Sequence, residues 1–448
     1  MAELSERGER LAQTLIKKIG NRSAKVAVIG LGYVGLPMAV ELSRSGFAVI
    51  GIDKDLKKVE QINAGKSYIL DVSEEVLCSL VKKNILTASH QYSLLREADI
   101  VIICVPTPLQ SFKQPDLSFI ISAARETAKS LKPGQLISME STTFPGTTEE
   151  VILPILESVG LTVGRDFFLA FSPERVDPGN AEYSTREITK IVGGVTPLCQ
   201  EVSCLFYQQF LSTVLPVSSP AAAEMTKILE NTYRSVNIAL VNEFMFLCDR
   251  MGLDIWEVVN AASTKPFGMH SFYPGPGVGG HCIPVDPFYL AWKAKDYDFC
   301  TRFIELASEI NTQASQFVVQ KLVSALNKQQ KCLNGSKILV LGVAYKKDID
   351  DVRESPAIKI ISQLVKNKAE VVYYDPYVPQ FRFFDKEEKI LHRVDLTEAA
   401  LSRTDCVLII TDHTNVDYQW VADHAGLILD TRNATKNVQK GREKIIKI

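Results

Sequence analysis

The sequence predicts an α/β protein in which two doubly wound parallel-sheet domains are joined by a central helical domain that contains a long helix. Two segments, one near the N-terminus and one after residue 335, alternate short β-branched runs with helical patterns, which is typical of parallel sheets. A helical pattern of about 30 residues lies between them. We therefore expect domains over residues 1–215, 216–330 and 331–448.

The first domain opens with a strand, turn, helix and strand that together span about 30 residues. Lys25–Ile29 is typical of a buried strand, Gly30–Gly35 has the pattern G-x-G-x-x-G, and Leu36–Ser45 has a helical pattern. The second strand, Ala48–Asp53, ends in a carboxylate. A glycine pattern in this context predicts a Rossmann-like unit that binds a dinucleotide.

The residues of the glycine loop have separate expected roles. Gly30 makes the tight turn, Gly32 lets the backbone approach the pyrophosphate, and Gly35 lets the helix pack on the strand. Tyr33 and Val34 complete the cofactor-binding loop.

The acid at the end of the second strand predicts NAD as the cofactor. Asp53 can accept hydrogen bonds from the adenosine ribose and would repel the 2′-phosphate of NADP. Lys57 and Lys58 weaken that exclusion slightly, and Lys58 is itself a candidate cofactor contact.

Polar residues follow three further predicted strands of this domain. In an open parallel sheet, ligands bind beyond the carboxyl ends of the strands, so these residues are candidates for cofactor or substrate contacts. A turn or a helix cap explains Thr107 equally well, and Thr147–Glu150 also looks like a helix start. The strands span residues 99–105, 135–140 and 168–171, and the polar residues are Thr107, Thr142, Glu174 and Arg175.

The central domain is expected to begin with a helix from Pro220 to about Met251, with Ser219 as its N-cap. Spacings of three and four place four polar residues on one face, which is either solvated or functional. Apolar residues are expected to form the packed side. The polar residues are Glu224, Lys227, Asn231 and Arg234, and the apolar ones are Ile228, Leu229, Val236 and Leu240.

A glycine-rich turn in the central domain precedes one cysteine and one carboxylate. Glycines at 275, 277, 279 and 280 permit a close approach of backbone to a ligand. Pro284 or Pro287 would suit the first position of a helix, so Cys282 would lie at or just before a helix N-terminus, where the dipole favours a thiolate. Alternatively, Cys282 is an ordinary buried cysteine and Asp286 an N-cap.

The third domain repeats the strand and helix order without the glycine pattern. Strands are expected over residues 336–342, 370–375 and 427–429, and a helix starts at Ser355-Pro356. The loop 343–355 carries Lys346, Lys347 and Arg353, and the last of these strands is followed by Arg432. Cations at strand ends suit the diphosphate of a second nucleotide, although salt bridges within the loop are an alternative.

Composition agrees with a cytoplasmic enzyme. The chain has 448 residues and a net charge of −2, and this slightly negative charge does not indicate binding to nucleic acid. No segment is long and apolar enough to span a membrane, and the N-terminal 20 residues have acids where a signal peptide has positive charge. Nine scattered cysteines predict neither a disulfide scaffold nor a metal site, and most lie in apolar runs.

From about Lys25 to Arg432, these motifs resemble the UDP-sugar 6-dehydrogenases, the family of UDP-glucose dehydrogenase and its N-acetylhexosamine relatives. The run Gly275–Trp292, with Tyr273 and Pro274 ahead of it, resembles the UDP-N-acetylglucosamine branch, which supplies uronic acids to bacterial surface polysaccharides. The resemblance implies a four-electron oxidation of the sugar C6 alcohol to a carboxylate, with two NAD molecules and no metal. It also implies that the enzyme is a homodimer or a higher homo-oligomer.

The resemblance also implies roles for individual residues. Cys282 would form a thiohemiacetal and then a thioester with the substrate. Lys227 and Asn231 would stabilise the oxyanion. Glu174 and Asp286 are both candidate bases, and Thr142, also a candidate cofactor contact, would orient water. The implied substrate contacts are Glu174, Arg175, Lys227, Asn231, Tyr273, Gly275, Gly277, Lys346 and Arg432.

Two other classes of function are weighed against this one. A β-hydroxyacid dehydrogenase would share the first two domains but would use neither Cys282 nor a third domain. An inactive nucleotide-binding regulator would be expected to have lost Cys282, Lys227 or Asp286, and all three are present. Within the family, UDP-N-acetylmannosamine, UDP-N-acetylgalactosamine and UDP-glucose are alternative substrates; the mannosamine enzymes typically lack Pro284.

Overall fold

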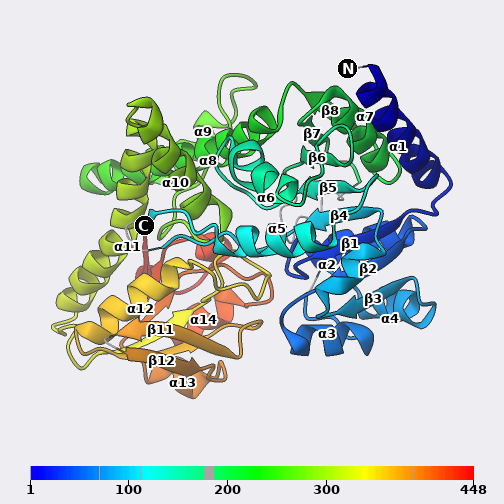
Figure 1. Ribbon diagram of the computed structural model, residues 1–448. Helices are drawn as coiled ribbons and strands as arrows, with labels where there is room; N and C mark the ends of the chain where they lie inside the picture. The colour runs from blue at the N-terminus through cyan, green and yellow to red at the C-terminus, as the bar shows by residue number, and fades with distance from the viewer. Residues whose placement is uncertain (1, 70, 111–112, 176–185, 386) are drawn as a thin grey trace. The chain divides into compact units, whose positions relative to one another are not determined.

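The computed structural model describes residues 2–69, 71–110, 113–175, 186–385 and 387–448 (Figure 1). The chain forms two compact units. The first unit comprises Met1–Glu230 and Phe288–Asp298, and the second comprises Asn231–Pro287 and Phe299–Ile448. Each unit is made of two separate segments of the chain, so this division does not test the three continuous domain ranges expected from the sequence. Those ranges stay a prediction.

The first unit contains an eight-stranded sheet in the order β3-β2-β1-β4-β5-β6-β7-β8. Neighbouring strands are parallel except for the antiparallel pair β6 and β7. Because β1 lies between β2 and β4, the loop after β1 sits where the strand order reverses, which is the usual place for a dinucleotide. The strands are β1 (Lys25–Ile29), β2 (Ala48–Ile52), β3 (Leu86–Ser89), β4 (Ile100–Ile103), β5 (Leu136–Met139), β6 (Phe168–Phe171), β7 (Lys190–Gly194) and β8 (Val214–Val217).

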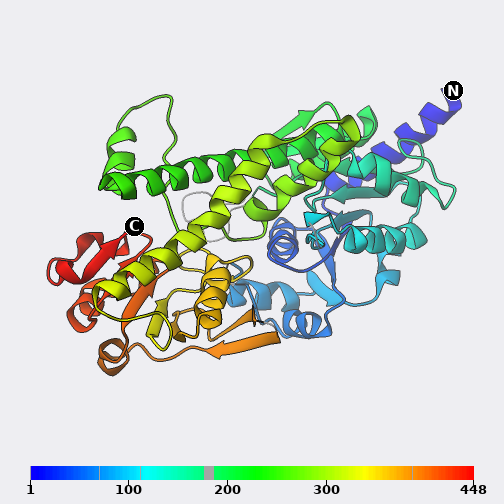
Figure 2. The same ribbon diagram turned by 90° about the vertical axis from the view of Figure 1, so that its left-hand side faces the viewer.

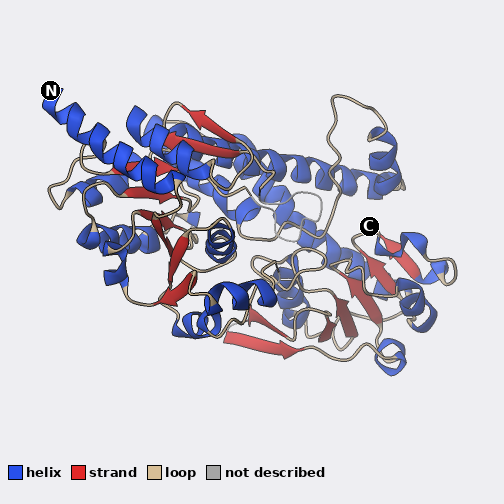
Figure 3. Cartoon of the chain, turned by 90° about the vertical axis from the view of Figure 1, so that its right-hand side faces the viewer, coloured by secondary structure: helices blue, strands red, loops and turns tan. Residues whose placement is uncertain are grey.

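Helices cover both faces of this sheet (Figure 3). Side chains of a strand alternate between the faces, so Val26 and Val28 pack with α1, α2 and α7, whereas Ala27 and Ile29 pack with α5 and α6. The helices are α1 (Ala2–Gly20), α2 (Gly35–Arg44), α3 (Leu56–Asn63), α4 (Glu74–Lys82), α5 (Ser118–Ser130), α6 (Leu153–Glu157) and α7 (Pro197–Tyr207), with shorter turns η1 (Tyr92–Arg96) and η3 (Thr148–Ile152).

The second unit contains a parallel sheet of five strands in the order β10-β9-β13-β14-β15 and a separate antiparallel hairpin, β11 with β12. One face of the sheet packs on α11 and α12, and the other packs on α13 and α14. The strands are β9 (Lys337–Leu341), β10 (Glu370–Tyr374), β11 (Gln380–Asp385), β12 (Glu387–His392), β13 (Cys406–Ile409), β14 (Ile428–Asp430) and β15 (Ile445–Lys447). The helices are α9 (Ile255–Ala262), α11 (Arg302–Lys328), α12 (Pro356–Lys366), α13 (Glu398–Ser402) and α14 (Tyr418–His424), with turns η4 (Ala294–Tyr297, in the first unit), η5 (Ala434–Asn437) and η6 (Arg442–Lys444).

The expected α/β architecture, with two parallel sheets and a helical segment between them, is confirmed. The long central helix α8 (Pro220–Met251) also begins where the sequence predicts, and the Ala222 N–H donates to the Ser219 hydroxyl at 3.2 Å. Figure 2 shows α8 in green and α11 in yellow-green. None of the helices in the described ranges is long and apolar enough to cross a membrane.

Two expectations for the central helices are wrong in part. α10 (Cys282–Lys293) begins at Cys282 itself, so Pro284 lies in its first turn, where no N–H is needed, and Pro287 lies inside the helix. On α8 the polar residues Glu224, Lys227 and Asn231 are buried and Arg234 is partly buried. The apolar residues Leu229 and Leu240 are instead 65% and 49% exposed. Spacing identifies a shared face but cannot tell which face is covered by other elements.

Candidate active site

The glycine loop after β1 has the geometry that its sequence predicts. Gly30 has φ +89°, and a Cβ at this position would lie 2.4 Å from the Cys104 carbonyl oxygen. A Cβ on Gly35, the first residue of α2, would lie 1.8 Å from the Gly30 carbonyl oxygen. A Cβ on Gly32 would meet no atom within 4 Å. Only glycine fits the first and third positions, while the second leaves space beside the backbone.

Asp53 lies directly after β2, beside the glycine loop. Its carboxylate accepts hydrogen bonds from the Leu31 N–H at 2.8 Å and the Asp55 N–H at 2.9 Å. The Lys58 ammonium lies 3.9 Å from the same carboxylate. The structure thus brings together the loop, Asp53 and Lys58, which the sequence proposed separately, and this arrangement fits the phosphates and ribose of NAD.

Hydroxyl groups follow β4 and β5 at the same edge of the sheet. Thr107 is buried, whereas Thr142 is partly exposed. The neighbouring Thr143 is also buried, and its hydroxyl has no hydrogen-bond partner among the described residues. The sequence gives no signal for Thr143, because two adjacent threonines after a strand do not indicate which side chain points inward.

Glu174 and Arg175 follow β6 and are held by different partners. One Glu174 oxygen accepts from the Arg175 N–H at 2.8 Å, and the other lies 3.4 Å from the Lys190 ammonium. The Arg175 guanidinium forms an ion pair with Glu230 at 2.7 Å and donates to the Thr189 carbonyl at 2.7 Å. Arg175 therefore anchors this segment to α8.

Glu224 on α8 is a buried residue for which the sequence suggested no role of its own. Its carboxylate accepts hydrogen bonds from the Gly146 N–H at 2.6 Å, the Thr148 N–H at 3.0 Å and the Thr148 hydroxyl at 2.7 Å. Burial raises the pKa of Glu224 to about 7, against the effect of these bonds. Glu224 fixes the loop after β5 to the same helix that carries Lys227, which is 8% exposed.

The cysteine segment belongs to the second unit. Cys282 is half-buried and opens α10, as expected for a thiol at a helix N-terminus. One turn later on that helix, Asp286 is fully buried and accepts a hydrogen bond at 2.7 Å from the side-chain amide of Asn231, itself 3% exposed. Burial and the nearby Arg353 cation lower the pKa of His281 to about 4, so this imidazole is neutral at physiological pH.

A cavity of about 720 Å³ opens in the second unit beside the carboxyl ends of its strands. Tyr273, Lys347 and Arg432 line it, together with Trp256, which stacks on Tyr273 at a ring distance of 5.7 Å. A Cβ on Gly275 would lie 2.6 Å from the Arg432 guanidinium, so the glycine permits this contact. The lining includes Lys347 and not Lys346, the lysine to which the resemblance assigned a contact.

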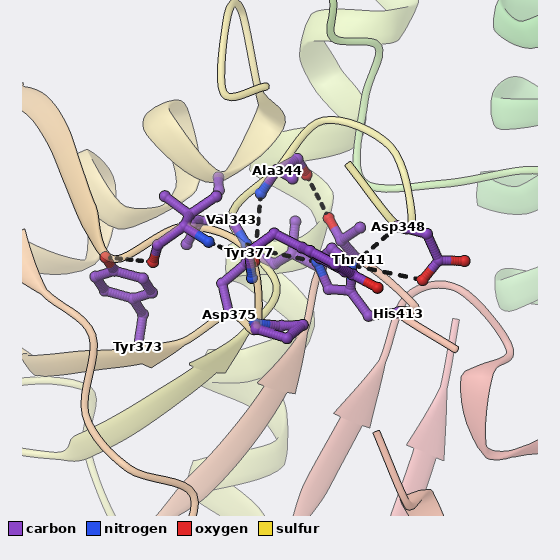
Figure 4. Close-up of polar contacts among 12 residues, drawn as sticks. Val343, Ala344, Asp348, Tyr373, Asp375, Tyr377, Thr411 and His413 are labelled. Atoms are coloured by element: carbon purple, nitrogen blue, oxygen red, sulfur yellow. Dashed lines mark hydrogen bonds and ion pairs between the residues drawn. The ribbon is translucent and has the colours of Figure 1, made fainter. Parts of the chain in front are cut away.

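A buried hydrogen-bond cluster, which includes the cavity-lining residue His413, holds the loop that follows β9 (Figure 4). The Asp375 carboxylate accepts from the Val343 N–H at 2.8 Å and pairs with His413 Nε2 at 3.0 Å. His413 Nδ1 accepts from the Asp348 N–H at 3.0 Å, which requires the tautomer with the proton on Nε2. Although burial opposes it, these bonds lower the pKa of Asp375. The loop that carries Lys347 is thereby fixed to β10 and β13.

The sheet order and the glycine loop define a dinucleotide-binding protein with a second parallel-sheet domain. Three profiles of one family match the chain: the NAD binding domain of the UDP-glucose/GDP-mannose dehydrogenase family over residues 24–211, its central domain over 221–313 and its UDP binding domain over 339–437. The chain belongs to this family.

Individual relatives extend along most of the chain. UDP-N-acetyl-D-glucosamine 6-dehydrogenase of Pseudomonas aeruginosa is 36% identical over 359 residues, which cover 80% of this chain and 84% of the relative. UDP-N-acetyl-D-mannosamine dehydrogenase of Methanococcus maripaludis is 35% identical over 404 residues, with coverage of 89% and 88%. The solved structure of UDP-D-ManNAc dehydrogenase from Pyrococcus horikoshii is 33% identical, with a TM-score of 0.84 and coverage of 94% and 98%.

Proposed function

We propose that the chain oxidises the C6 hydroxyl of a UDP-N-acetylhexosamine to the uronic acid, and that UDP-N-acetylglucosamine is its preferred substrate. The observation that carries this proposal is Cys282, a half-buried thiol at the first position of α10, with Asp286 one helical turn further on. The helix dipole favours the nucleophilic thiolate at such a position. Removal of a single hydride needs no thiol. In a four-electron oxidation, a thiol can hold the aldehyde intermediate covalently between the two hydride transfers.

The cofactor contacts follow from the first unit. The loop Gly30–Gly35, Asp53 and Lys58 would hold NAD, with Thr107 and Thr142 at the neighbouring strand ends. NAD supplies the hydride acceptor, and one molecule is used for each of the two oxidation steps.

Cys282 has the central role in the second oxidation. Its thiolate adds to the C6 aldehyde, and the oxygen takes up a proton to form a thiohemiacetal. Loss of that proton to a base and of a hydride to the hydride acceptor gives a thioester. Water then attacks the thioester, releasing the carboxylate and the thiol. Lys227 and Asn231 stabilise the oxyanion at C6. Glu174 and Asp286 are the candidate bases, and Thr142 would orient the attacking water.

The nucleotide part of the substrate is assigned to the cavity in the second unit. The cations Lys347 and Arg432 suit a diphosphate, and the stacked rings of Trp256 and Tyr273 offer an apolar surface to a base or ribose. Tyr273, Gly275 and Gly277 are proposed contacts from the segment before Cys282. Lys346 remains a candidate contact.

The preference for N-acetylglucosamine rests on the run from Tyr273 to Leu290, because relatives named for glucosamine and mannosamine derivatives are similar in identity. A site with room and a hydrogen-bond partner for a 2-acetamido group should penalise UDP-glucose by about 2–4 kcal/mol. The test is kcat/KM for NADH production with UDP-N-acetylglucosamine, UDP-N-acetylmannosamine, UDP-N-acetylgalactosamine and UDP-glucose. An equal or higher value for any of the other three would contradict the preference.

We also propose that the enzyme is a cytoplasmic homodimer. Exposed apolar side chains recur along α8 at spacings of three, four and seven residues, which places them on one face of the helix. A second copy of the chain would cover this face. The side chains are Met225, Leu229, Tyr233, Leu240, Phe244, Leu247 and Met251.

A further inference from the structure

A buried cluster of two carboxylates and one ammonium lies behind Glu174. The Lys190 ammonium lies 2.9 Å from one Glu140 oxygen and 3.4 Å from one Glu174 oxygen. The other Glu140 oxygen accepts a hydrogen bond of 2.6 Å from the Tyr207 hydroxyl, which lies 2.8 Å from the Ser138 hydroxyl. Segments distant in the sequence, at β5, β6, β7 and α7, meet in this cluster.

Exposure increases along the cluster toward Glu174. The side chains of Glu140, Lys190 and Glu174 are 0%, 6% and 15% exposed. Glu174 is therefore the member of this trio that a reacting proton reaches most readily. Its second oxygen accepts from the Arg175 N–H at 2.8 Å, so both oxygens of the carboxylate have defined partners.

The charges of the cluster do not balance when both carboxylates are ionised. Burial raises the pKa of Glu140, and Glu174 adds to this effect against the opposing Lys190. Burial also disfavours the Lys190 ammonium, but the two carboxylates outweigh it and raise the pKa of Lys190. Within the described ranges, Cys104 and Tyr207 are further titratable side chains that act on Glu140 or Lys190. With one ammonium and two carboxylates, uptake of a single proton leaves one balanced ion pair in the interior.

We propose that Lys190 and Glu140 are positioning residues that hold Glu174 in place and set how readily it takes up a proton during the reaction. The Lys190 cation favours the ionised form of Glu174, whereas the Glu140 anion favours the protonated form. When Glu174 accepts the proton of a substrate hydroxyl or an attacking water, Lys190 and Glu140 remain as a neutral pair. The inference rests on the proposed function, in which Glu174 is a candidate base.

The test is the pH dependence of kcat in variants of the two positioning residues. Lys190→Met should move the acidic limb of the profile to higher pH by about one to three units, because the cation that favours the carboxylate is lost. Glu140→Gln should move it to lower pH, by about one unit, because Glu174 becomes the sole counter-ion of Lys190. Lys190→Arg keeps the cation, so its acidic limb should lie at the same pH as that of the wild type. A purely structural role would lower kcat equally at every pH.

Two further variants keep the test decisive. Lys190→Met leaves the Glu140 charge buried without its cation and can prevent folding, so the double variant Lys190→Met/Glu140→Gln removes one charge of each sign. Its limb should lie at higher pH than that of Glu140→Gln alone. Lys293→Met is the matched control, because Lys293 forms an ion pair with Glu150 at 2.6 Å and is also largely buried, and its limb should stay in place.

The outcomes separate this inference from the function on which it rests. If the wild-type chain oxidises no UDP-sugar, the proposed function is wrong and the inference is wrong with it. The inference alone is overturned in two cases in which the wild-type chain is active. In the first, the acidic limb of the pH profile stays in place in both single variants, Lys190→Met and Glu140→Gln. In the second, the limb moves in the same direction in both.

Discussion

At the scale of single residues, Cys282 is the group on which the proposed chemistry depends. Cys282→Ser should abolish net formation of the uronic acid, because a serine hydroxyl is a far weaker nucleophile toward the aldehyde than a thiolate. Binding of NAD and UDP-sugar should change little. Product is measured by mass spectrometry, and Cys300→Ser, at an exposed cysteine, is the control. Wild-type turnover by the serine variant would eliminate the thioester mechanism.

Asp53 is expected to bind the adenosine ribose of the cofactor through hydrogen bonds. Asp53→Ala removes a hydrogen-bond acceptor and a charge that repels a 2′-phosphate, so the preference for NAD over NADP should narrow. The measurement is the ratio of kcat/KM for the two cofactors. The Leu31 and Asp55 N–H groups donate hydrogen bonds to this carboxylate, and the alanine variant loses both bonds. Asp53→Asn is the matched control, because it removes the charge but retains an oxygen acceptor. An unchanged ratio in Asp53→Ala would assign ribose recognition to another residue.

Glu224 should make the stability of the protein depend on pH. Its pKa is about 7 in the folded chain, against 4.5 for an unperturbed glutamate, so the folded state binds the proton more tightly. Its contribution is present in full below the unfolded pKa and is lost as pH rises through the folded one, a change of up to about 3 kcal/mol.

Glu224→Gln removes this titration while keeping the shape of the side chain. The variant should therefore lose less thermal stability than the wild type between pH 5 and pH 8, whatever its absolute melting temperature. Melting is followed by circular dichroism at both values. Parallel changes in the two proteins would show that Glu224 does not titrate in this range.

At the scale of secondary-structure elements, α8 combines a buried polar face with an exposed apolar one. Leu240→Glu/Phe244→Glu should convert a dimer to a monomer, because two charges would have to be buried in the interface. Molar mass from light scattering is the measurement. Val159→Asp places a charge on another exposed apolar side chain and should leave the mass unchanged. A wild-type chain that is monomeric at micromolar concentration would contradict the assignment.

Elements with strong local signals could be predicted from the sequence. β1 lies where expected, because a β-branched run before glycines indicates a strand. α8 begins where expected, because a serine followed by a proline indicates the start of a helix. Both signals depend on only a few neighbouring residues. The sequence does not set apart the hairpin of β11 and β12, which has no glycine between its strands, or the helix α11, whose N-terminus has no side-chain cap. α10 began earlier than expected because proline is tolerated throughout the first turn.

At the scale of the whole chain, the sequence could supply the members of the site but not their contacts. Asp53 and the glycine loop are neighbours because β1 and β2 pair, which the motif itself implies. The ion pairs of Lys190 with Glu140 and Glu174 depend on the order of β5, β6 and β7, and β7 pairs antiparallel with β6. Local sequence patterns do not encode that order. For the same reason the hydrogen bond between Asn231 and Asp286, 55 residues apart, could not be predicted.

A four-electron oxidation of the C6 alcohol uses two NAD for each sugar, so the stoichiometry of the reaction distinguishes it from a two-electron oxidation. Purified enzyme is incubated with a limiting amount of UDP-N-acetylglucosamine and excess NAD, and NADH is measured by absorbance while the uronic acid is measured by mass spectrometry. We expect two NADH for each UDP-sugar consumed, with the carboxylate as the only sugar product. One NADH for each UDP-sugar consumed, with the aldehyde as the product, would contradict it.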